Sequence, residues 1–410
     1  MDEQLNWLIS VDDHLVEPGH LWQTWLPAKY KDQSPRLTRK EDGADYWEFE
    51  GHSYPTSGLN AVDQRGEFNP GPVSYDALRP GAYDPVPRIQ DMDRDGVLAS
   101  LVFPSPFPRF CGQTFSEAKD KDLGLACLRA YNDWMIDEWC AAAPGRFIPM
   151  ILVPLFDASL ARDEVFRCAG KGAKAVAFSE NPSALGFPSI HDKDRYWDPL
   201  LDAVNETGMP LCMHIGSSSK LPTTSPDAPM IITVALTPLN AFYTACDWLL
   251  STLFIRFPKV RICLSEGGIG WVPYLLERLD YTMERHGSWA SKADFKVDFS
   301  VGQSDVREGG SLVNTDRLPS ELFREHVFGC FISGEQHGIN SIDEIGVDNI
   351  MIETDYPHSD SSWPNSIELA HKSLRKLSKE DTYKLLQGNA RRVFDFEPAV
   401  PPALSGPKPG

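Results

Sequence analysis

The sequence predicts an α/β fold, a (β/α)8 TIM barrel with long insertions after strand 1 and between strands 6 and 7. Eight short apolar runs alternate with longer segments that have helical periodicity. The runs are continuous and do not alternate with polar residues, which is typical of parallel strands covered on both faces. No GxGxxG follows the first run, which disfavours a doubly wound open sheet.

The expected strands follow one another in order along the chain. They cover residues 7–14, 99–106, 147–154, 173–180, 209–216, 260–267, 326–333 and 349–356. Helical patterns fall between most of them, at 116–144, 159–172, 196–208, 239–258, 270–286 and 366–396. Gly or Pro stops several of these patterns, as at Gly208 and Pro258.

Residues 1–396 are expected to form a single metal-dependent barrel domain. Two stretches exceed a minimal barrel: 27–83 is rich in Pro, Gly, Tyr and charge, and 287–325 is polar with little periodicity. Both are predicted to be insertions that serve as lids or oligomer contacts. The Pro-rich tail 397–410 is predicted to be disordered.

Composition and charge exclude several classes of protein. The formal net charge of -19 argues against nucleic-acid binding, because phosphate contacts need Lys and Arg. We find no apolar run of about 18 residues, and therefore expect no membrane span. The first residues lack the features of a signal peptide, so a cytoplasmic protein is expected. The eight scattered cysteines have no CxxC spacing and are predicted to be buried free thiols.

Acidic and imidazole side chains follow the ends of the expected strands. Because the carboxyl ends of the strands form the functional face of a (β/α)8 barrel, these side chains should converge there. A ring of His, Asp and Glu is a common way to hold a divalent metal. The residues concerned are Asp12, Asp13, His14, Glu180, His214, Glu266, Glu335, His337, Asp355 and His358.

The Asp12-Asp13-His14 run ends the first strand. Alternate residues of a strand point to the same side, so Asp12 and His14 are expected to face into the barrel. Asp13 then faces the surrounding helices or solvent.

Simpler roles stay open for single residues. His214 could be a core histidine, and Asp355 could be an ordinary loop aspartate. Glu266 could cap a helix that starts near Ile269, and Glu17 could cap a helix in the segment that follows it. Their joint placement at one end of the barrel favours a metal site over these separate explanations.

Four motifs, in this order, carry a resemblance: VDDHLVEP, MPLCMHIG, ICLSEGGIGWVP and NIMIETDYPHSDSSWPNS. With them the chain resembles the amidohydrolase superfamily, specifically the amidohydrolase 2 group of aminocarboxymuconate-semialdehyde decarboxylase and related enzymes. The resemblance implies a barrel whose metal is held by an HxH pair on strand 1, a His on strand 5 and an Asp on strand 8. A strand-6 His commonly assists.

Carried over to this chain, His14, His214 and Asp355 match the family pattern. Asp12 and Glu266 stand where the family usually has His. The predicted metal ligands are therefore Asp12, His14, His214, Glu266 and Asp355. Two carboxylates in place of imidazoles shift the preference from Zn toward Fe or Mn, with one or two ions. Residues predicted to serve a second metal or an outer shell are Glu17, Glu335, His337 and His358.

The first functional hypothesis is metal-assisted hydrolysis or decarboxylation of an apolar or aromatic small molecule with a carboxyl or carbonyl group. Asp355 and Glu266 are the predicted catalytic residues, either of them as general base. Arg65, Arg79 and Arg88 could hold a substrate carboxylate. The chain is expected to form a homodimer, with 287–325 among the contacts.

The alternative is a non-heme di-iron monooxygenase that hydroxylates a hydrophobic terpenoid or acyl thioester. The carboxylate-rich ligand set is typical of oxygen-activating di-iron sites. The chain also resembles, in this respect, the TIM-barrel di-iron diterpenoid monooxygenase of platensimycin biosynthesis. A third hypothesis is a binding protein that kept the barrel and lost the chemistry.

Overall fold

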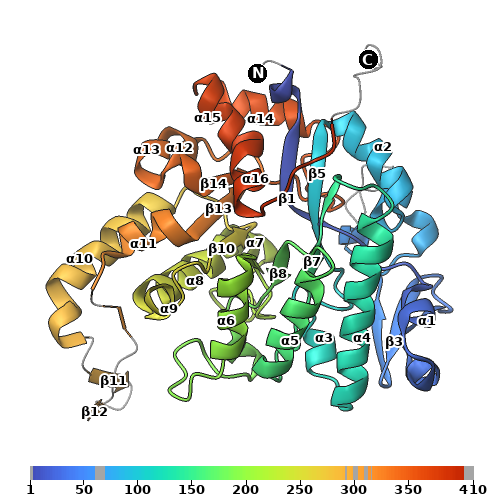
Figure 1. The fold of residues 1–410 in the computed structure, drawn as a ribbon, viewed down its shortest axis with the longest axis horizontal. Helices are drawn as coiled ribbons and strands as arrows, with labels where there is room; N and C mark the ends of the chain where they lie inside the picture. Colours follow the sequence, from blue (N-terminus) through green and yellow to red (C-terminus); the bar gives the residue numbers. More distant parts are fainter. Residues whose placement is uncertain are drawn as a thin grey trace.

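The computed structural model describes residues 3–60, 70–290, 293–298, 303–308, 313–314 and 316–400. Helices surround a central set of parallel strands (Figure 1). Within the described residues, no helix has the length and apolar character needed to cross a membrane.

Eight strand positions form the barrel. The neighbouring barrel strands that pair through backbone hydrogen bonds are parallel to each other. One position is interrupted at Pro149, so β6 pairs with the preceding strand and β7 with the following one. The barrel strands are β1 (Leu8–His14), β5 (Val97–Phe103), β6 (Phe147–Ile148), β7 (Met150–Ile151), β8 (Ala175–Ala177), β9 (Leu211–His214), β10 (Ile262–Ser265), β13 (Val327–Phe331) and β14 (Ile350–Ile352). The predicted (β/α)8 barrel is confirmed.

The barrel closes where the last strand meets the first. The Asp355 amide donates to the Asp12 carbonyl at 3.0 Å, and the His14 amide donates to the Tyr356 carbonyl at 2.6 Å. These bonds continue beyond the end of β14, so the carboxyl ends of β1 and β14 are fixed against each other.

Asp13 ties this closure together, and its surroundings decide between the two sequence-based alternatives in favour of the helix layer. The carboxylate is buried, not solvated, and it accepts hydrogen bonds from Ser10 Oγ at 2.9 Å and Thr354 Oγ1 at 2.5 Å. Arg88 Nη2 of α2 (Pro85–Asp95) lies 3.7 Å from Asp13 Oδ2. Ser100 of β5 also donates to this carboxylate. Asp13 therefore faces the helix layer and links three strands to one helix.

Helices cover the outside of the barrel (Figure 1). Aspartate side chains cap several of them, such as Asp120 at α4 and Asp157 at α5, by accepting hydrogen bonds from first-turn amides. The α-helices not yet bounded are α1 (Leu21–Trp25), α3 (Gln113–Ser116), α4 (Lys121–Trp134), α5 (Ala158–Ala169), α6 (Asp198–Thr207), α7 (Met230–Leu236), α8 (Pro238–Leu250), α9 (Leu253–Arg256), α10 (Val272–Ala290), α11 (Pro319–His326), α12 (Gln336–Asn340), α13 (Ile342–Ile345), α14 (Ser366–Leu374), α15 (Lys379–Tyr383) and α16 (Asn389–Val393).

Three long helical patterns are divided in the structure. The pattern at 116–144 becomes α3, α4 and a π-helical turn, Met135–Cys140. The pattern at 239–258 breaks at Ser251, whose hydroxyl accepts a hydrogen bond from the Leu253 amide at the start of α9. The pattern at 366–396 breaks similarly at Ser378, which caps α15. Serine hydroxyls compete with the helical backbone, and apolar periodicity alone does not reveal this.

The stretch predicted as the first insertion holds a small antiparallel sheet of β2 (Arg36–Arg39), β3 (Asp45–Phe49) and β4 (His52–Pro55). Trp47 of β3 packs against Trp22 and stacks on Phe107, with ring centroids 4.8 Å and 5.2 Å apart. The sheet is thereby held against the loop that follows β5. Arg65 lies outside the described residues.

The second stretch, 287–325, is more regular than predicted. It contains the end of α10, the hairpin of β11 (Ala293–Asp298) and β12 (Gln303–Glu308), and α11. Leu322, Phe323 and His326 of α11 are buried, so this helix belongs to the barrel layer. Of the predicted tail, Ala399 donates its amide to the Gly145 carbonyl at 2.8 Å, and residues 401–410 lie outside the described residues.

All eight cysteines are free. Seven of them are buried and Cys246 is half-buried. The prediction of free thiols is confirmed, as is their burial for all but Cys246.

Replacing Asp13 by Ala should lower the free energy of unfolding by about 3–5 kcal/mol, because Arg88 would be left buried without its carboxylate. Urea unfolding followed by circular dichroism measures this difference. The control is Asp76→Ala, which removes an exposed partner of Arg39 and should cost less than about 1 kcal/mol. Equal effects of the two substitutions would contradict the role given to Asp13.

Candidate metal centre at the barrel mouth

The five residues predicted as metal ligands lie together at the carboxyl ends of β1, β9, β10 and β14. His14 Nε2 is 3.2 Å from Asp355 Oδ1 and 3.6 Å from Asp12 Oδ1. His214 Nε2 is 3.6 Å from Asp12 Oδ2 and 3.5 Å from Glu266 Oε2. The two imidazole Nε2 atoms are 3.2 Å apart. Side chains from four strands thus converge on one small volume.

His358, predicted only for a second metal or outer shell, belongs to the same group. Its Nδ1 lies 2.7 Å from Asp355 Oδ1 and 3.8 Å from Glu266 Oε1, and its ring stacks on His14 with centroids 3.9 Å apart. Burial opposes the charged imidazole, yet the Asp355 carboxylate outweighs it and raises the pKa of His358 to about 10. His358 is therefore an imidazolium beside two carboxylates.

The arrangement contains two overlapping sets of donor atoms. One set is His14, Glu266, Asp355 and His358, and the other is Asp12, His14 and His214. Within each set the donor atoms lie within 4.8 Å of one another. Mixed imidazole and carboxylate donors suit divalent Mn, Fe and Zn, and the share of carboxylates favours the harder ions.

Asp12 gives the strongest indication that this site binds a cation. It is fully buried, and neither carboxylate oxygen accepts a hydrogen bond from any residue the structure describes. Burial and the nearby carboxylates, Glu353 foremost, raise the pKa of Asp12 well above its usual range. An uncompensated buried carboxylate is costly. The residues present therefore fit a cation held between Asp12, His14 and His214.

Glu353 is a residue of this site that the sequence analysis missed. It is buried two positions before Asp355, and its Oε2 accepts a hydrogen bond from the Glu266 amide at 3.2 Å. Its Oε1 has no hydrogen-bond partner within the described chain. The i, i+2 rule that paired Asp12 with His14 would have found Glu353 beside Asp355 in the same way.

The backbone is strained at two of these residues. Glu266 has a φ of 53° and Asp355 a φ of 62°, in the left-handed region that residues other than Gly rarely adopt. Such conformations cost about 1–3 kcal/mol each and persist only where the surroundings hold them. The Glu353 carboxylate holds the Glu266 amide, and the closure of the barrel holds that of Asp355. In this backbone conformation the two carboxylates point toward the imidazoles of His14 and His214.

Glu17 is not part of this group. Its carboxylate accepts hydrogen bonds from the Ser105 amide at 3.0 Å and from Ser105 Oγ at 2.5 Å. It is also not the cap of α1, because the helix begins at Leu21 after His20, with no side-chain cap. Burial raises the pKa of Glu17 to about 7. Glu17 therefore holds the loop that follows β5.

Glu335 and His337 are not in the group either. Glu335 accepts hydrogen bonds from the amides of Ile269 and Gly270 at 3.2 Å and 3.0 Å. Glu335, and not Glu266, thus holds the amides near Ile269, which lie ahead of the first residue of α10 at Val272. His337 is exposed on α12.

Two of the arginines considered for binding a substrate carboxylate make other contacts. Arg88 is buried and donates to the carbonyls of His14 and Gly81 at 2.9 Å and 3.2 Å. Arg79 donates to both oxygens of Asp91. These two residues stabilise the fold, and that part of the sequence interpretation is wrong for them.

Aromatic rings flank the two imidazoles. Phe110 stacks on His214 with centroids 3.9 Å apart, and Phe103 lies edge-on to His214 at 5.1 Å. Burial lowers the pKa of His214 to about 3, so this imidazole is neutral and can ligate a metal. The centre therefore has one apolar, aromatic side.

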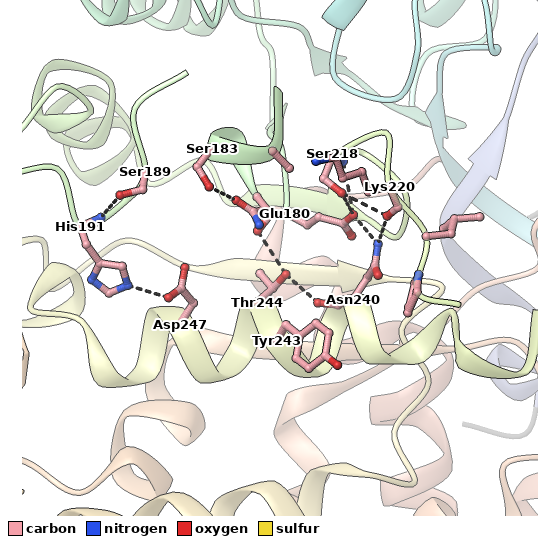
Figure 2. Close-up of a pocket in the computed structure, with 14 residues that line it drawn as sticks. Glu180, Ser183, Ser189, His191, Ser218, Lys220, Asn240, Tyr243, Thr244 and Asp247 are labelled. Atoms are coloured by element: carbon pink, nitrogen blue, oxygen red, sulfur yellow. Dashed lines mark hydrogen bonds and ion pairs between the residues drawn. The ribbon is translucent and has the colours of Figure 1, made fainter. Parts of the chain in front are cut away.

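A cavity of about 540 Å³ lies behind the loop that follows His214 (Figure 2). Glu180 lines it, and Glu180 Oε1 accepts hydrogen bonds from the Gly216 amide at 3.0 Å, Ser218 Oγ at 2.6 Å and Asn240 Nδ2 at 2.5 Å. Burial raises the pKa of Glu180 to about 7. The Glu180 carboxylate, which follows β8, supports the loop and does not join the donor group.

A (β/α)8 barrel with buried His, Asp and Glu donors at its carboxyl face is the architecture of a metal-dependent enzyme. The comparisons with known proteins agree with this class. The amidohydrolase family model matches residues 19–396, and the chain belongs to that family.

Among curated proteins, the chain is similar to gamma-resorcylate decarboxylase of Rhizobium sp. (strain MTP-10005). The two are 26% identical over 296 residues, which cover 68% of this chain and 79% of the relative.

Solved structures share the fold. An amidohydrolase from Mycobacterium avium subsp. paratuberculosis K-10 matches with a TM-score of 0.69 and 21% identity, covering 95% of this chain and 99% of that one. The 5-carboxyvanillate decarboxylase of Sphingomonas paucimobilis matches with a TM-score of 0.63 and 19% identity, covering 95% and 99%. The dihydroxybenzoic acid decarboxylase of Polaromonas sp. JS666, with bound manganese and the inhibitor 2-nitroresorcinol, matches with a TM-score of 0.59 and 19% identity, covering 95% and 97%.

The family resemblance read from the four motifs is confirmed. The monooxygenase alternative, and the likeness to the diterpenoid monooxygenase, find no support among these proteins.

Adding Mn²⁺ to chelator-treated protein should raise its melting temperature, since an ion at a hundred times its Kd stabilises the folded state by about 2.7 kcal/mol. Asp12→Asn should weaken Mn²⁺ binding at least tenfold in calorimetry. Glu335→Gln makes the same chemical change outside the donor group and should alter the affinity less than twofold. Unchanged affinity in Asp12→Asn would remove Asp12 from the centre.

The metal-free protein should become less stable as the pH rises from about 5 to 8. Glu17 has a folded pKa of about 7, above its usual value, so the folded state keeps a proton that the unfolded chain has released. Urea titrations at four pH values should show a shallower decline for Glu17→Gln, while Glu41→Gln, at an exposed position, leaves the slope unchanged. Identical slopes for all three proteins would refute this prediction.

Proposed function

We propose that this protein is a metal-dependent decarboxylase of an aromatic carboxylate, with manganese as the preferred ion. The observation that carries the proposal is the buried Asp12 carboxylate, unpartnered between His14 and His214 at the barrel mouth. The names of the similar proteins support the substrate class, since they act on resorcylate and dihydroxybenzoate.

The proposed metal ligands are Asp12, His14, His214 and Asp355, with Glu266 as a fifth. Bound there, a divalent cation would supply positive charge that attracts the oxygens of an aryl carboxylate and stabilises the negative charge developing during the reaction. Glu353 and Glu266 lie side by side next to this ligand set, so a second ion held by carboxylates is part of the same proposal.

The apolar, aromatic side of the centre suits an aromatic substrate. Phe110 lies flat on His214, so an aromatic ring entering from this side meets apolar surface next to the donor group. Aromatic rings favour such stacked or edge-on contacts. The hydrolysis hypothesis, in which Glu266 or Asp355 is the base for a water molecule, uses the same carboxylates. It gives no role to the aromatic side of the centre.

Decarboxylation breaks the bond between ring carbon and carboxylate, leaves the electron pair on the ring carbon and releases CO₂. That carbon must then receive a proton. We assign the transfer of this proton to Asp355, which receives it from the neighbouring His358 imidazole and passes it to the ring carbon. His358 Nδ1, 2.7 Å from Asp355 Oδ1, can return a proton to it after each turnover. Glu266 is the second candidate for proton transfer.

We also propose that the enzyme acts as a homodimer in the cytoplasm. Both the homodimer and the cytoplasmic assignment stay predictions from the sequence.

Manganese-loaded protein should release CO₂ from 2,6-dihydroxybenzoate or 5-carboxyvanillate, detected by coupled assay and by the loss of ultraviolet absorbance. Asp355→Asn should lower kcat/KM at least a thousandfold, because the proton donor to the ring carbon is removed. His337→Ala, at an exposed position, should leave kcat/KM unchanged. Cleavage of esters or amides without CO₂ release from aryl carboxylates would identify a hydrolase instead.

A further inference from the structure

The cavity of about 540 Å³ beside Glu180 is separate from the proposed metal centre, because none of the proposed metal ligands lines it. It nevertheless adjoins the aromatic side of that centre. A Cβ placed on Gly216 would lie 3.3 Å from Leu221, which lines the cavity, and 3.7 Å from Phe110, which stacks on His214. The cavity is therefore a second concave site, next to the loop that follows β9.

The Glu180 carboxylate uses only one of its oxygens within the fold. Besides the bonds from the Gly216 amide, Ser218 Oγ and Asn240 Nδ2, Oε1 accepts one from the Ser218 amide at 3.3 Å. Oε2 has no hydrogen-bond partner within the described chain, although Glu180 is only 5% exposed. The donors to Oε1 are uncharged, and Lys220, which also lines the cavity, is exposed. A buried carboxylate oxygen in this position favours a charged donor, because charge-assisted hydrogen bonds are about twice as strong as neutral ones.

Helix α8 gives the cavity its length. Asn240, Thr244 and Asp247 line the cavity at intervals of four and three residues, a spacing that places them on one face of the helix. Seven helical residues rise by about 10 Å. Figure 2 shows the Glu180 carboxylate near Asn240 at one end and the pair of His191 and Asp247 at the other, with Nε2 2.6 Å from Oδ1. This shape suits an elongated molecule better than a single ion.

The cavity also has apolar lining residues that are open to solvent. Leu221 is 46% exposed and Tyr243 is 59% exposed, and Pro222 lies in the chain directly after Leu221. A ligand that covers these side chains removes apolar surface from water, and an aromatic ring packs well on the ring of Tyr243. The lining therefore matches a molecule with a cationic end and an aromatic body.

We propose that this cavity binds a small arylalkylamine, whose ammonium group donates to Glu180 Oε2 and whose ring lies against Leu221 and Tyr243. A hydroxyl group on the ring meets the pair of His191 and Asp247 at the far end. A neutral alcohol brings no charge to Oε2, and an aryl carboxylate, the proposed substrate class of the metal centre, is repelled by Glu180. The two sites therefore select ligands of opposite charge, and this inference does not rest on the proposed reaction.

Tyramine, a phenol with an ethylammonium chain, is the probe that tests the proposal. Calorimetry at pH 8, above the pKa of about 7 of Glu180, should show one tyramine bound per chain. Glu180→Gln keeps an oxygen for the loop amides but replaces the other by an amide nitrogen, and should raise the Kd for tyramine at least thirtyfold. Glu335→Gln makes the same change at a carboxylate that holds loop amides outside the cavity, and should alter the Kd less than twofold.

Two further measurements keep the test decisive if Glu180→Gln does not fold. Tyrosol, in which a hydroxyl replaces the ammonium of tyramine, should bind the wild-type protein at least tenfold more weakly. Tyr243→Ala should weaken tyramine binding at least threefold, whereas Tyr281→Ala, at a 47% exposed position on α10, should leave it unchanged. Equal affinities for tyramine and tyrosol overturn the proposal, as does wild-type protein that binds no tyramine. Unchanged binding in a folded Glu180→Gln or Tyr243→Ala variant also overturns it.

Discussion

The burial of several carboxylates around two imidazoles is the constraint on which the rest of this structure depends. Asp12, Glu353 and Asp355 are almost entirely buried, and the Glu266 side chain is only 19% exposed. Carboxylates this close together cannot all carry charge in a low-dielectric site without a compensating cation. The imidazolium of His358 supplies part of that compensation. In our proposal, a divalent ion supplies the remainder.

The supporting structure is arranged to hold these groups against their mutual repulsion. Asp13 and Arg88 tie β1, β5 and β14 to α2 directly behind Asp12 and His14. Glu353 holds the strained amide of Glu266, and Glu180 holds the loop after His214. The contacts of Asp13 are buried and those of Glu353 and Glu180 are part-buried, so the residues that follow β1, β9 and β10 are held from within the barrel.

Strand order and the inward-facing residues could be predicted from the sequence for physical reasons. Buried parallel strands are continuous apolar runs, and alternation along β1 separates Asp12 and His14 from Asp13. Helix breaks at Ser251 and Ser378 could not be predicted, because they depend on local serine hydrogen bonds. The partners of Glu17 and Glu335 lie 88 and 66 positions away in the chain, beyond the reach of local pattern. The sequence pattern places His358 only in an outer shell, because its position beside Asp355 depends on the left-handed turn at Asp355.

The central claim is that the group around Asp12 and His14 holds a divalent ion. Anomalous X-ray diffraction from crystals grown with Mn²⁺, recorded on both sides of the manganese absorption edge, tests it directly. A manganese peak within bonding distance of Asp12, His14, His214 and Asp355 is the predicted result. A difference map without a peak at these residues, or with manganese bound only elsewhere, would contradict it.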